Sequence, residues 1–351
     1  MRVVVAGAGA FGSAVAVQLA RAGARVTLAD PAAPAANASG VAAGMLAPAF
    51  EAAADEYLVL KAARDAWPAF ADSLPADLGL QRCGAVWLDL PGAEPRMQAL
   101  AAILASRGAE HQLWTARELA ERAPGLSPSF AGGLFTAEDW RISPPAALAS
   151  LARAAADAGA ERVRRTVCDF SGGQVRFDDG ETAPADALVL ATGPAALALA
   201  PETSLLAPIK GHILRYADTR APSGGPCLRT AKGYAVPAAD GLRVGATMEE
   251  GVGDPVVDPR AAAPLADLAA ALYPALDGAT CLIEAGVRAT TADGWPLVGA
   301  SAAPGVWLAL GARRNGWLLA PLVAQMTTAY LAGGDPGPFA GLFEARRFAV
   351  A

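Results

Sequence analysis

The sequence predicts an α/β fold in which a Rossmann-like dinucleotide-binding domain is joined to a second, β-rich domain. Three observations lead to this prediction. A glycine-rich turn, residues 7–12, lies between an apolar strand and an apolar helix. A second apolar strand, within residues 186–193, ends in a small polar turn. Two blocks of different character, residues 79–140 and 200–285, contain β-like runs between the parts that carry these features.

The first strand and helix flank the glycine turn. Val3–Ala6 is entirely apolar, which is typical of a strand buried in a parallel sheet. Gly7-Ala8-Gly9-Ala10-Phe11-Gly12 then has the G-x-G-x-x-G pattern, and a helix is predicted from about Ala10 to Ala22. A second strand, Arg25–Ala29, ends at Asp30. The strand, turn, helix and acid occur at the spacing of a dinucleotide-binding unit.

Each glycine of this turn has a separate role. Gly7 permits the tight turn, Gly9 lets the backbone approach a pyrophosphate, and Gly12 allows the helix to pack closely on the strand. The phosphates then lie at the helix N-terminus, where free N–H groups and the helix dipole favour negative charge. Asp30 is placed to accept hydrogen bonds from an adenosine ribose. An acid at this position argues against a 2′-phosphate, so the cofactor is NAD or FAD.

Other interpretations of the N-terminus exist. Residues 3–20 carry no charge, which is long enough for a membrane span, and Arg2 before an apolar run also occurs in signal peptides. Three glycines in the run disfavour one continuous helix, at about 1 kcal/mol each relative to alanine. A glycine turn that binds no ligand is the remaining alternative.

The elements that follow continue the α/β pattern. A run of small residues over 38–48 lets backbone lie flat against a large planar ligand, although it could equally begin an alanine-rich helix. The turn Thr192-Gly193 ends an apolar strand and can approach the cofactor. The other predicted elements are a helix at 145–158, strands around 162–170 and at 174–177, and a hairpin turn at Asp179-Gly180.

The chain leaves the nucleotide-binding domain and returns to it more than once. Residues 1–78, 141–199 and 286–351 are assigned to that domain, and residues 79–140 and 200–285 to the second one. Strand-like runs such as Ala85–Leu88 and Ile213–Tyr216 mark the second domain as β-rich. At 351 residues, two domains are expected.

Composition excludes several classes of function. The net charge is −6, which argues against nucleic acid as a partner. The four cysteines form no C-x-x-C, so neither a zinc site nor a disulfide framework is indicated. Only two histidines, His111 and His212, are present, and neither receives a catalytic role. A cytoplasmic globular protein is expected.

The last third carries the most specific motifs. Gly286-Val287-Arg288 and Asp293-Gly294-Trp295-Pro296 precede the strand Val306–Leu310, and Arg314-Asn315-Gly316 then opens a helix that runs to about Leu331. With the glycine turn, Ala43–Leu46 and Val244–Met248, these motifs resemble the flavin-dependent amine and amino-acid oxidases of the D-amino-acid oxidase family. Within it the sequence is most similar to the glycine oxidases associated with thiazole biosynthesis. The resemblance extends over essentially the whole chain.

The resemblance implies a discontinuous FAD-binding domain of the glutathione-reductase type, covered by a β-rich substrate domain. It implies oxidation of an amine by hydride transfer from Cα to flavin N5. Arg288 matches the arginine that pairs with the substrate carboxylate, and Tyr234 matches the tyrosine that helps to hold it. The other implied substrate-binding residues are Arg314, Met45 and Met248. The expected cofactor-binding residues are Gly7, Gly9, Ala10, Phe11, Gly12, Asp30, Ser39, Ala43, Gly44, Met45, Val167, Thr192, Gly193, Arg313, Arg314, Asn315, Gly316, Trp317 and Leu318.

Physical chemistry supports these roles beside the resemblance. A buried carboxylate needs a partner, and a planar guanidinium can meet it with two parallel hydrogen bonds. The N-terminus of the last long helix, with Arg313 or Arg314, would stabilise negative charge on a reduced flavin. Without the resemblance, Arg288 is a surface residue of a turn, Tyr234 a strand residue, and Met45 and Met248 core filler.

The sequence also departs from the family. The ribose acid is Asp30 in place of glutamate, and Ala312 and Arg313 replace a histidine and an aromatic residue. Ala289 replaces a proline after the arginine. Covalently flavinylated members use a cysteine near the end of the chain, but none follows Cys281 here, so non-covalent FAD is expected.

The expected reaction is oxidation of a small amino acid to an imine, which hydrolyses to an α-keto acid and ammonia, while dioxygen reoxidises the flavin to give hydrogen peroxide. A D-amino-acid dehydrogenase, or an oxidase of sarcosine or another secondary amine, is the alternative on the same fold. An NAD-binding dehydrogenase or a non-catalytic nucleotide sensor is the alternative from a different class. Relatives often form homo-oligomers, but no surface patch in the sequence identifies one.

Overall fold

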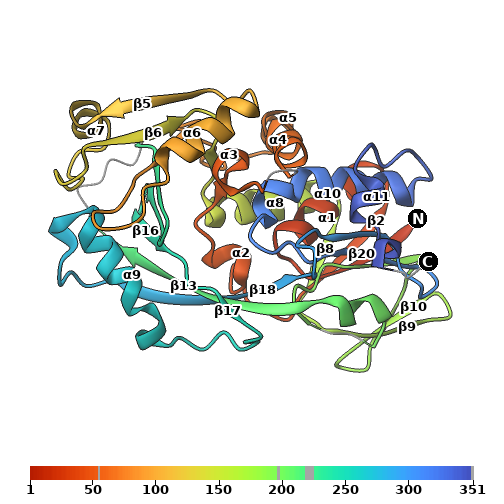
Figure 1. Cartoon of the computed structure of the whole chain (residues 1–351). Coiled ribbons are helices and arrows are strands. Elements are labelled where there is room, and N and C mark those ends of the chain that lie inside the picture. Colours follow the sequence, from red (N-terminus) through yellow and green to blue (C-terminus); the bar gives the residue numbers. More distant parts are fainter. Residues whose placement is uncertain (54–55, 196–197, 218–224, 349–351) are drawn as a thin grey trace.

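A six-stranded sheet forms the centre of the part of the molecule that contains both termini (Figure 1). The computed structural model describes residues 1–53, 56–195, 198–217 and 225–348. The sheet is parallel except at one edge, where one strand pairs antiparallel with its neighbour. In spatial order its strands are β19 (Leu297–Ala300), β20 (Val306–Leu310), β12 (Ala187–Leu190), β1 (Arg2–Ala6), β2 (Arg25–Ala29) and β8 (Glu161–Val163).

Both faces of this sheet are covered, which explains why its strands are almost entirely apolar. Val3 and Val5 of β1 belong to a core shared with helices, whereas Val4 and Ala6 point into a core on the opposite face. The opposite face is covered by a three-stranded antiparallel sheet of β9 (Val167–Ser171), β10 (Gln174–Phe177) and β11 (Thr182–Pro184). The helices on the first face are α1 (Ala10–Arg21), α4 (Tyr57–Asp65), α5 (Trp67–Asp72), α8 (Pro144–Asp157) and α10 (Gly316–Leu331).

A nine-stranded sheet forms the other half of the molecule. Its long strands β13 (Ala207–Tyr216) and β18 (Leu282–Thr290) run antiparallel side by side and extend toward the first half (Figure 1). The remaining strands are β17 (Glu249–Glu250), β16 (Gly241–Gly245), β15 (Gly233–Ala238), β14 (Cys227–Thr230), β4 (Ala85–Trp87), β6 (Gly132–Thr136) and β5 (His111–Thr115).

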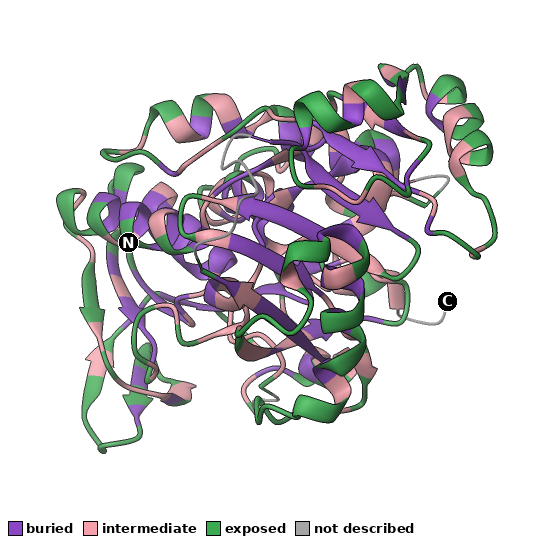
Figure 2. Ribbon diagram, turned by 90° about the vertical axis from the view of Figure 1, so that its left-hand side faces the viewer, coloured by how far each residue is buried: buried purple, intermediate pink, exposed green. Residues whose placement is uncertain are grey.

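One face of the nine-stranded sheet is packed by helix α9 (Pro259–Leu272). Leu265, Leu268 and Leu272 recur at the spacing of one helix face, and they are buried against strand residues such as Leu214 and Val244. The buried strands at the centre of Figure 2 include this sheet. The opposite face carries a smaller core that includes Ile213 and Val236, and this side faces the first half of the molecule.

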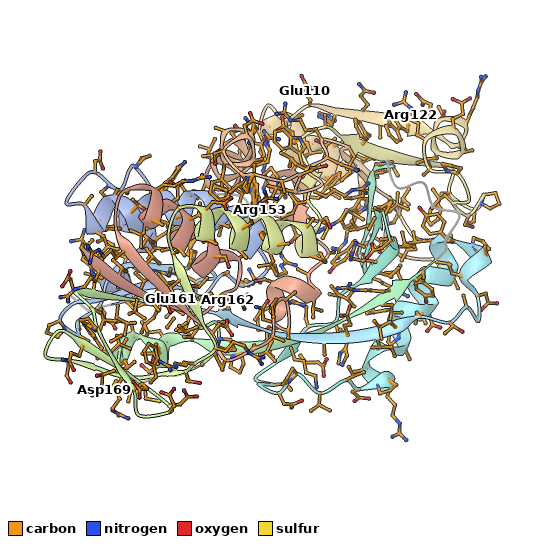
Figure 3. All side chains as sticks on the ribbon, turned by 180° about the vertical axis from the view of Figure 1, so that it is seen from behind. Glu110, Arg122, Arg153, Glu161, Arg162 and Asp169 are labelled. Atoms are coloured by element: carbon orange, nitrogen blue, oxygen red, sulfur yellow. The ribbon has the colours of Figure 1, made fainter. Side chains whose placement is uncertain are left out.

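Charged side chains such as Arg153 and Glu161 lie on the outer surface (Figure 3).

Short elements complete the described parts of the chain. The short elements are α2 (Ala38–Val41), β3 (Met45–Leu46), α3 (Pro48–Glu51), α6 (Met97–Ser106), α7 (Ala116–Arg122), β7 (Trp140–Arg141), α11 (Ala340–Phe343) and the 3-10 helices η1 (Pro201–Leu205), η2 (Pro274–Leu276) and η3 (Ala345–Phe348).

Most predicted elements are confirmed within one or two residues, but one expectation is corrected. The stretch predicted as one strand around residues 162–170 is two strands in different sheets, because β8 pairs with β2 whereas β9 pairs with β10. In the small-residue run at 38–48 a short helix, α2, begins at Ala38 and is followed by β3 and α3, and the contact of this run with a planar ligand stays a prediction. No helix in the described parts of the chain combines the length and the apolar character needed to cross a bilayer.

The assignment of residue ranges to two domains stays a prediction. The boundary predicted at residue 286 falls inside β18, which is one continuous strand of the nine-stranded sheet. The predicted boundaries at residues 78 and 199 fall outside the named helices and strands.

Candidate active site

A cavity of about 730 Å³ lies between the ends of the parallel strands and the inner side of the nine-stranded sheet. Its walls include the glycine turn, the α2–α3 segment, the inner ends of β13, β15 and β18, and the loop before α10. All five predicted substrate-binding residues line this cavity. So do all predicted cofactor-binding residues except Gly12 and Leu318.

The glycine turn forms one end of the cavity. Asp30, at the end of β2, accepts a hydrogen bond from Ala8 N–H at Oδ2 (2.6 Å) and another from Ala32 N–H at Oδ1 (2.8 Å). The carboxylate therefore also holds the turn in place, in addition to the ribose contact that the sequence predicts.

Gly12 and Leu318 lie behind the wall. A Cβ atom at Gly12 would overlap the carbonyl oxygen of Gly7, so this glycine allows the close approach of helix and turn. This is the packing role that the sequence analysis assigned to it. The Leu318 side chain is fully buried in the core beneath α10, so a cofactor contact of this residue would have to use its backbone, and that contact stays a prediction.

Ser39 joins three segments of the cavity wall. Its hydroxyl accepts a hydrogen bond from Ala10 N–H (2.9 Å), and its carbonyl accepts one from the Trp317 indole N–H (3.0 Å). The carbonyl oxygens of Trp317 and Leu318 in turn accept the Trp67 indole N–H, at 3.1 and 3.2 Å. The N-terminal turns of α1 and α10 are thus tied to each other through α2.

The loop before α10 has a constrained backbone. Arg313 has a φ of 48°, in the left-handed region that non-glycine residues rarely adopt, and its N–H donates to Ala289 O (2.8 Å). Such positions cluster where a site imposes them. No side chain caps the N-terminus of α10. The positive end of this helix dipole is therefore directed at the cavity, and within the described residues no side chain caps it.

Arg288 projects from β18 across Gly211 of β13. A Cβ atom at Gly211 would overlap the Arg288 guanidinium, so the glycine makes the space that this group occupies. Arg288 Nη1 donates to the thioether sulfur of Met248 (3.1 Å), which is a weak acceptor. Burial lowers the pKa of Arg288. Among the residues that the structure describes, no carboxylate forms an ion pair with this guanidinium.

Tyr234 lies on the neighbouring strand β15. Gly245 is its cross-strand partner, and a Cβ there would come within 2.6 Å of the tyrosine hydroxyl. Burial raises the pKa of Tyr234, although the nearby Arg288 and Arg229 oppose this effect. The hydroxyl therefore stays protonated and can donate a hydrogen bond beside Arg288.

Four charged residues of the cavity, Glu51, Arg165, Arg229 and Lys232, are not among the predicted site residues, and two of these, Glu51 and Arg229, form an ion pair. Glu51, at the end of α3, forms ion pairs with Arg229 of β14 and with Arg314 Nη2, the latter at 2.9 Å. Burial would raise the pKa of Glu51, but Arg229 and Arg314 lower it below its usual value, so the carboxylate is ionised. Arg229 also donates to Met45 Sδ (3.3 Å). No local motif marks either residue, because each is an isolated charge in an otherwise ordinary segment.

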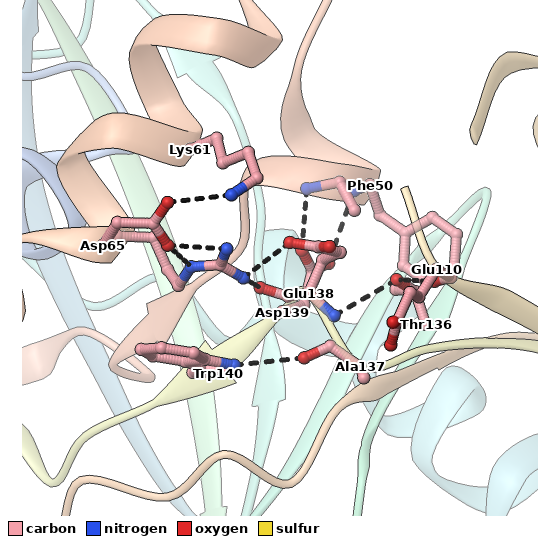
Figure 4. A network of polar contacts seen from close by, with 11 residues as sticks. Phe50, Lys61, Asp65, Glu110, Thr136, Ala137, Glu138, Asp139 and Trp140 are labelled. Atoms are coloured by element: carbon pink, nitrogen blue, oxygen red, sulfur yellow. Dashed lines mark hydrogen bonds and ion pairs between the residues drawn. The ribbon is translucent and has the colours of Figure 1, made fainter. Parts of the chain in front are cut away.

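A second buried carboxylate supports the helix that carries Glu51. Asp139 accepts hydrogen bonds from Ala49 N–H (2.7 Å) and Phe50 N–H (3.3 Å) at the N-terminus of α3 (Figure 4). Burial raises the pKa of Asp139 to about 7. Its neighbour Glu138 forms an ion pair with Arg64 of α4 (2.7 Å), which connects this support to the helical layer (Figure 4).

His212 is a structural residue beneath the cavity. The side chain is fully buried, and its Nε2 accepts the Asp258 N–H (2.9 Å). The ring proton is therefore on Nδ1, which lies 3.1 Å from Thr247 Oγ1 and 2.9 Å from Glu249 Oε1. The histidine fixes the loop that carries Met248, in agreement with its exclusion from catalysis on sequence grounds.

The cavity fits a dinucleotide with a planar ring system. Gly7 and Gly44, both at positive φ, line the cavity where a Cβ would overlap the backbone of Ala191 and Ile142, so only glycine lets the chain pack this closely in the cavity wall. Gly9 caps α1 without a side chain, which leaves that helix end open to a phosphate. The residues present can hold the pyrophosphate at α1, an adenosine near Asp30 and Val167, and a flavin near Gly44 and α10.

A Rossmann-type sheet, a glycine turn at a helix N-terminus and one long cavity shared with a β-rich half define an oxidoreductase that uses a dinucleotide. The chain belongs to the DAO family of FAD-dependent oxidoreductases: the family model described as "FAD dependent oxidoreductase" matches residues 2–330. Its cofactor is therefore FAD and not NAD, the other dinucleotide that the glycine turn allowed.

Two relatives and one solved structure are similar over nearly the whole chain. The chain is 32% identical over 347 residues to a glycine oxidase of Geobacillus kaustophilus (strain HTA426), with 92% of this chain and 91% of the relative covered. It is 29% identical over 377 residues to a glycine oxidase of Pseudomonas putida (strain KT2440), with 97% and 98% covered. The crystal structure of glycine oxidase from Geobacillus kaustophilus matches with a TM-score of 0.87 at 28% identity, covering 99% of this chain and 100% of that chain. The predicted fold class and family are confirmed.

Proposed function

We propose that this protein oxidises a small amino acid, glycine or a similar one, to an imine that hydrolyses to an α-keto acid and ammonia, with dioxygen reduced to hydrogen peroxide. For glycine the keto acid is glyoxylate. One observation carries the proposal: a half-buried guanidinium, Arg288, lines the cavity, donates a hydrogen bond to a thioether there, and has no carboxylate in an ion pair with it among the described residues. A charge in such a place is expected to have an anionic partner, and a substrate carboxylate is a fitting one.

Different residues of the cavity would then contact different parts of the substrate. Arg288 pairs with the carboxylate, and the Tyr234 hydroxyl donates a further hydrogen bond without adding charge. Met45 and Met248 restrict the space beside them with flexible apolar side chains. No side chain has to remove the Cα proton if the amine is neutral, so these residues act by orientation and electrostatics.

The cofactor-binding residues keep the roles predicted from sequence. FAD, when bound, supplies the redox chemistry by accepting a hydride from the substrate. The open N-terminus of α10, with Arg313 and Arg314, would stabilise negative charge nearby. Glu51 pairs with Arg314 and thereby restricts where its long side chain can lie.

The comparisons support an amino-acid substrate, because the two relatives described above are both named glycine oxidase. A D-amino-acid dehydrogenase, or an oxidase of sarcosine or another secondary amine, would use the same carboxylate pocket. We therefore expect a dehydrogenase to differ from the proposed oxidase in the reactivity of its flavin toward oxygen, and an oxidase of secondary amines to differ in the space near the substrate amine.

The decisive experiment uses purified holoenzyme and a panel of amines that includes glycine, sarcosine and a D-amino acid. We expect bleaching of the flavin absorbance under anaerobic conditions, rapid recovery when air is admitted, and peroxide in proportion to the amine consumed. Slow recovery in air would favour the dehydrogenase alternative. A colourless protein unable to take up FAD would remove the proposal and favour the NAD-binding alternative.

Three further expectations belong to this proposal. Non-covalent attachment predicts that FAD is released on denaturation. The four cysteines are free thiols, the state that a reducing cytoplasm maintains, so we place the protein there. The division into a FAD-binding domain and a substrate domain, and a homo-oligomeric state, are proposed from the family resemblance.

A further inference from the structure

We propose that the Met248 thioether is a site of oxidation by hydrogen peroxide. The sulfoxide oxygen then accepts hydrogen bonds from the Arg288 guanidinium and thereby weakens substrate binding. The site itself follows from the contacts of Met248. The loss of substrate affinity and the natural source of peroxide rest on the function proposed above, in which Arg288 binds the substrate carboxylate and turnover releases peroxide.

Met248 combines access with a nearby cation. Its side chain is 41% exposed, the loop that carries it lies between β16 and β17, and it lines the cavity. Its sulfur lies 3.1 Å from Arg288 Nη1 and accepts a hydrogen bond from it. A thioether sulfur has two lone pairs, so one remains available to attack an oxidant while the other faces the guanidinium.

The loop holds Met248 in this position. The Thr247 hydroxyl accepts a hydrogen bond from His212 N–H (2.8 Å) and donates one to Glu249 Oε1 (3.0 Å). Because His212 is fully buried, these contacts anchor the two residues beside Met248 to the sheet. The backbone at Met248 therefore has less conformational freedom than that of an unrestrained surface loop, and this favours the position of the sulfur beside Arg288.

Of the other four methionines, only Met45 also lines the cavity beside a cation, and that cation is Arg229. Met326 is buried in the core, and Met97 is a half-buried residue of α6 outside the cavity. Met45 is half-buried and contacts Arg229 in place of Arg288. Met1 is exposed but lies outside the cavity, so its oxidation has no route to the substrate pocket.

The chemistry is a two-electron oxidation of sulfur. A lone pair of Met248 Sδ attacks one peroxide oxygen, a new S–O bond forms, and the O–O bond breaks. The departing hydroxide takes the remaining proton of the attacked peroxide and leaves as water. One thioether and one hydrogen peroxide thus give one sulfoxide and one water.

Oxidation changes what Arg288 contacts. A thioether is a weak acceptor, and a substrate carboxylate can displace it from the guanidinium. A sulfoxide oxygen is polar and a much stronger acceptor. Held on the same side chain, it competes with the carboxylate for the same N–H groups, so accumulated peroxide lowers the affinity for substrate.

The experiment begins with added hydrogen peroxide and holoenzyme without substrate, so it does not depend on turnover. Peptide mass spectrometry follows the gain of one oxygen at each methionine. We expect Met248 to be oxidised before Met45, Met97 and Met326. In parallel, the dissociation constant of a simple carboxylate such as glycolate, measured from the flavin absorbance, should rise about tenfold as Met248 is converted.

Two variants separate the cause from general damage. Met248→Leu keeps a similar volume without sulfur, and its own affinity before treatment is the baseline for its affinity afterwards. We expect no further loss in this variant on exposure to peroxide, whereas the control Met97→Leu should lose affinity as the parent protein does. Methionine sulfoxide reductase should restore the affinity of the oxidised parent.

Two outcomes would overturn the inference. One is oxidation of Met248 no faster than that of Met45 or Met97. The other is complete oxidation of Met248 with an unchanged affinity for glycolate. If no amine reduces the flavin, the proposed amino-acid oxidase function fails, but both measurements on Met248 can still be made.

Discussion

Arg288 and Tyr234 owe their places in the cavity to two glycines on neighbouring strands. Gly211 leaves room for the guanidinium and Gly245 for the tyrosine hydroxyl. Neither glycine has a positive φ, so their value lies in the missing side chain and not in backbone freedom. The proposed carboxylate pocket therefore depends on four residues, two expected to bind the carboxylate and two glycines that make space for them.

Replacement of Arg288 by alanine tests the carboxylate contact. Loss of a buried, hydrogen-bonded charge pair weakens binding by about 2–5 kcal/mol, so we expect the dissociation constant of the amino acid to rise by about thirtyfold or more. FAD uptake should persist. The matched control is Arg260→Ala, which removes an exposed guanidinium on α9. An unchanged affinity for the amino acid in Arg288→Ala would refute the assigned role.

Gly211→Ala tests the space beside Arg288. The added Cβ would lie 2.8 Å from Arg288 Cζ and from Thr247 O, and would overlap Nη2, so the guanidinium must move. We expect about a tenfold loss of affinity for carboxylates, as for one lost charged hydrogen bond. Gly253→Ala is the control, because its Cβ would have only Pro208 near it, at 3.7 Å. Circular dichroism and FAD content check that both variants fold, and equal carboxylate affinities in the two would contradict this account.

At the level of elements, the short helix α3 positions the carboxylate of Glu51 in the cavity wall. Its four residues are too few to be stable as an isolated helix. Asp139, from the loop before β7, binds the N–H groups of Ala49 and Phe50 and thereby fixes its first turn. The orientation of Glu51, and with it the positions of Arg229 and Arg314, depends on this cap.

The pKa of Asp139 predicts a pH dependence of stability. The folded pKa of about 7 lies above the value near 4 expected when unfolded. Between these values the folded state binds a proton that the unfolded state does not, so the free energy of unfolding decreases as the pH rises through about 7. The full effect is at most about 4 kcal/mol.

Asp139→Asn removes this titration, so we expect its free energy of unfolding to vary less between pH 4 and pH 7 than that of the parent. Urea unfolding at several pH values measures the difference. The exposed Asp72→Asn should follow the parent protein. If the parent and Asp139→Asn show parallel pH profiles, the raised pKa is wrong.

On the scale of the whole molecule, the cavity is the place where the two large sheets meet. The six-stranded sheet contributes the glycine turn and the loop before α10, and the nine-stranded sheet contributes Arg288 and Tyr234. Strands β13 and β18 pair over nine residues and carry groups of the cavity wall, so they fix the second sheet relative to the first. A ligand that fills the cavity therefore contacts both halves at once.

Removal of FAD should lower stability for this reason. A ligand at a hundredfold excess over its dissociation constant adds about 2.7 kcal/mol to the free energy of unfolding, which corresponds to a rise of several degrees in Tm. We expect this shift when FAD is added to apoprotein in thermal unfolding, and no shift with NAD at the same concentration. Stabilisation by NAD and not by FAD would contradict the assigned cofactor.

Local patterns were enough to predict the elements that are mostly apolar. Strands β1 and β2, helix α1, and the pair β20 and α10 lie where the sequence places them, because burial leaves runs of apolar residues interrupted by few polar ones. The predicted strand around residues 162–170 failed for the opposite reason. It is polar and half-exposed, so nothing in its pattern shows that β8 joins one sheet and β9 another.

The sequence by itself determined the dinucleotide turn and the order of the motifs, since these depend on neighbours along the chain, and the family resemblance added Arg288 and Tyr234 to the residues expected in the cavity. Only the tertiary structure decided that Glu51 forms ion pairs with both Arg229 and Arg314, and that the Met248 sulfur accepts a hydrogen bond from Arg288. Contacts such as Met45 with Arg229 link residues 184 positions apart. Their energy depends on distance and burial, and neither exists until the two sheets have come together.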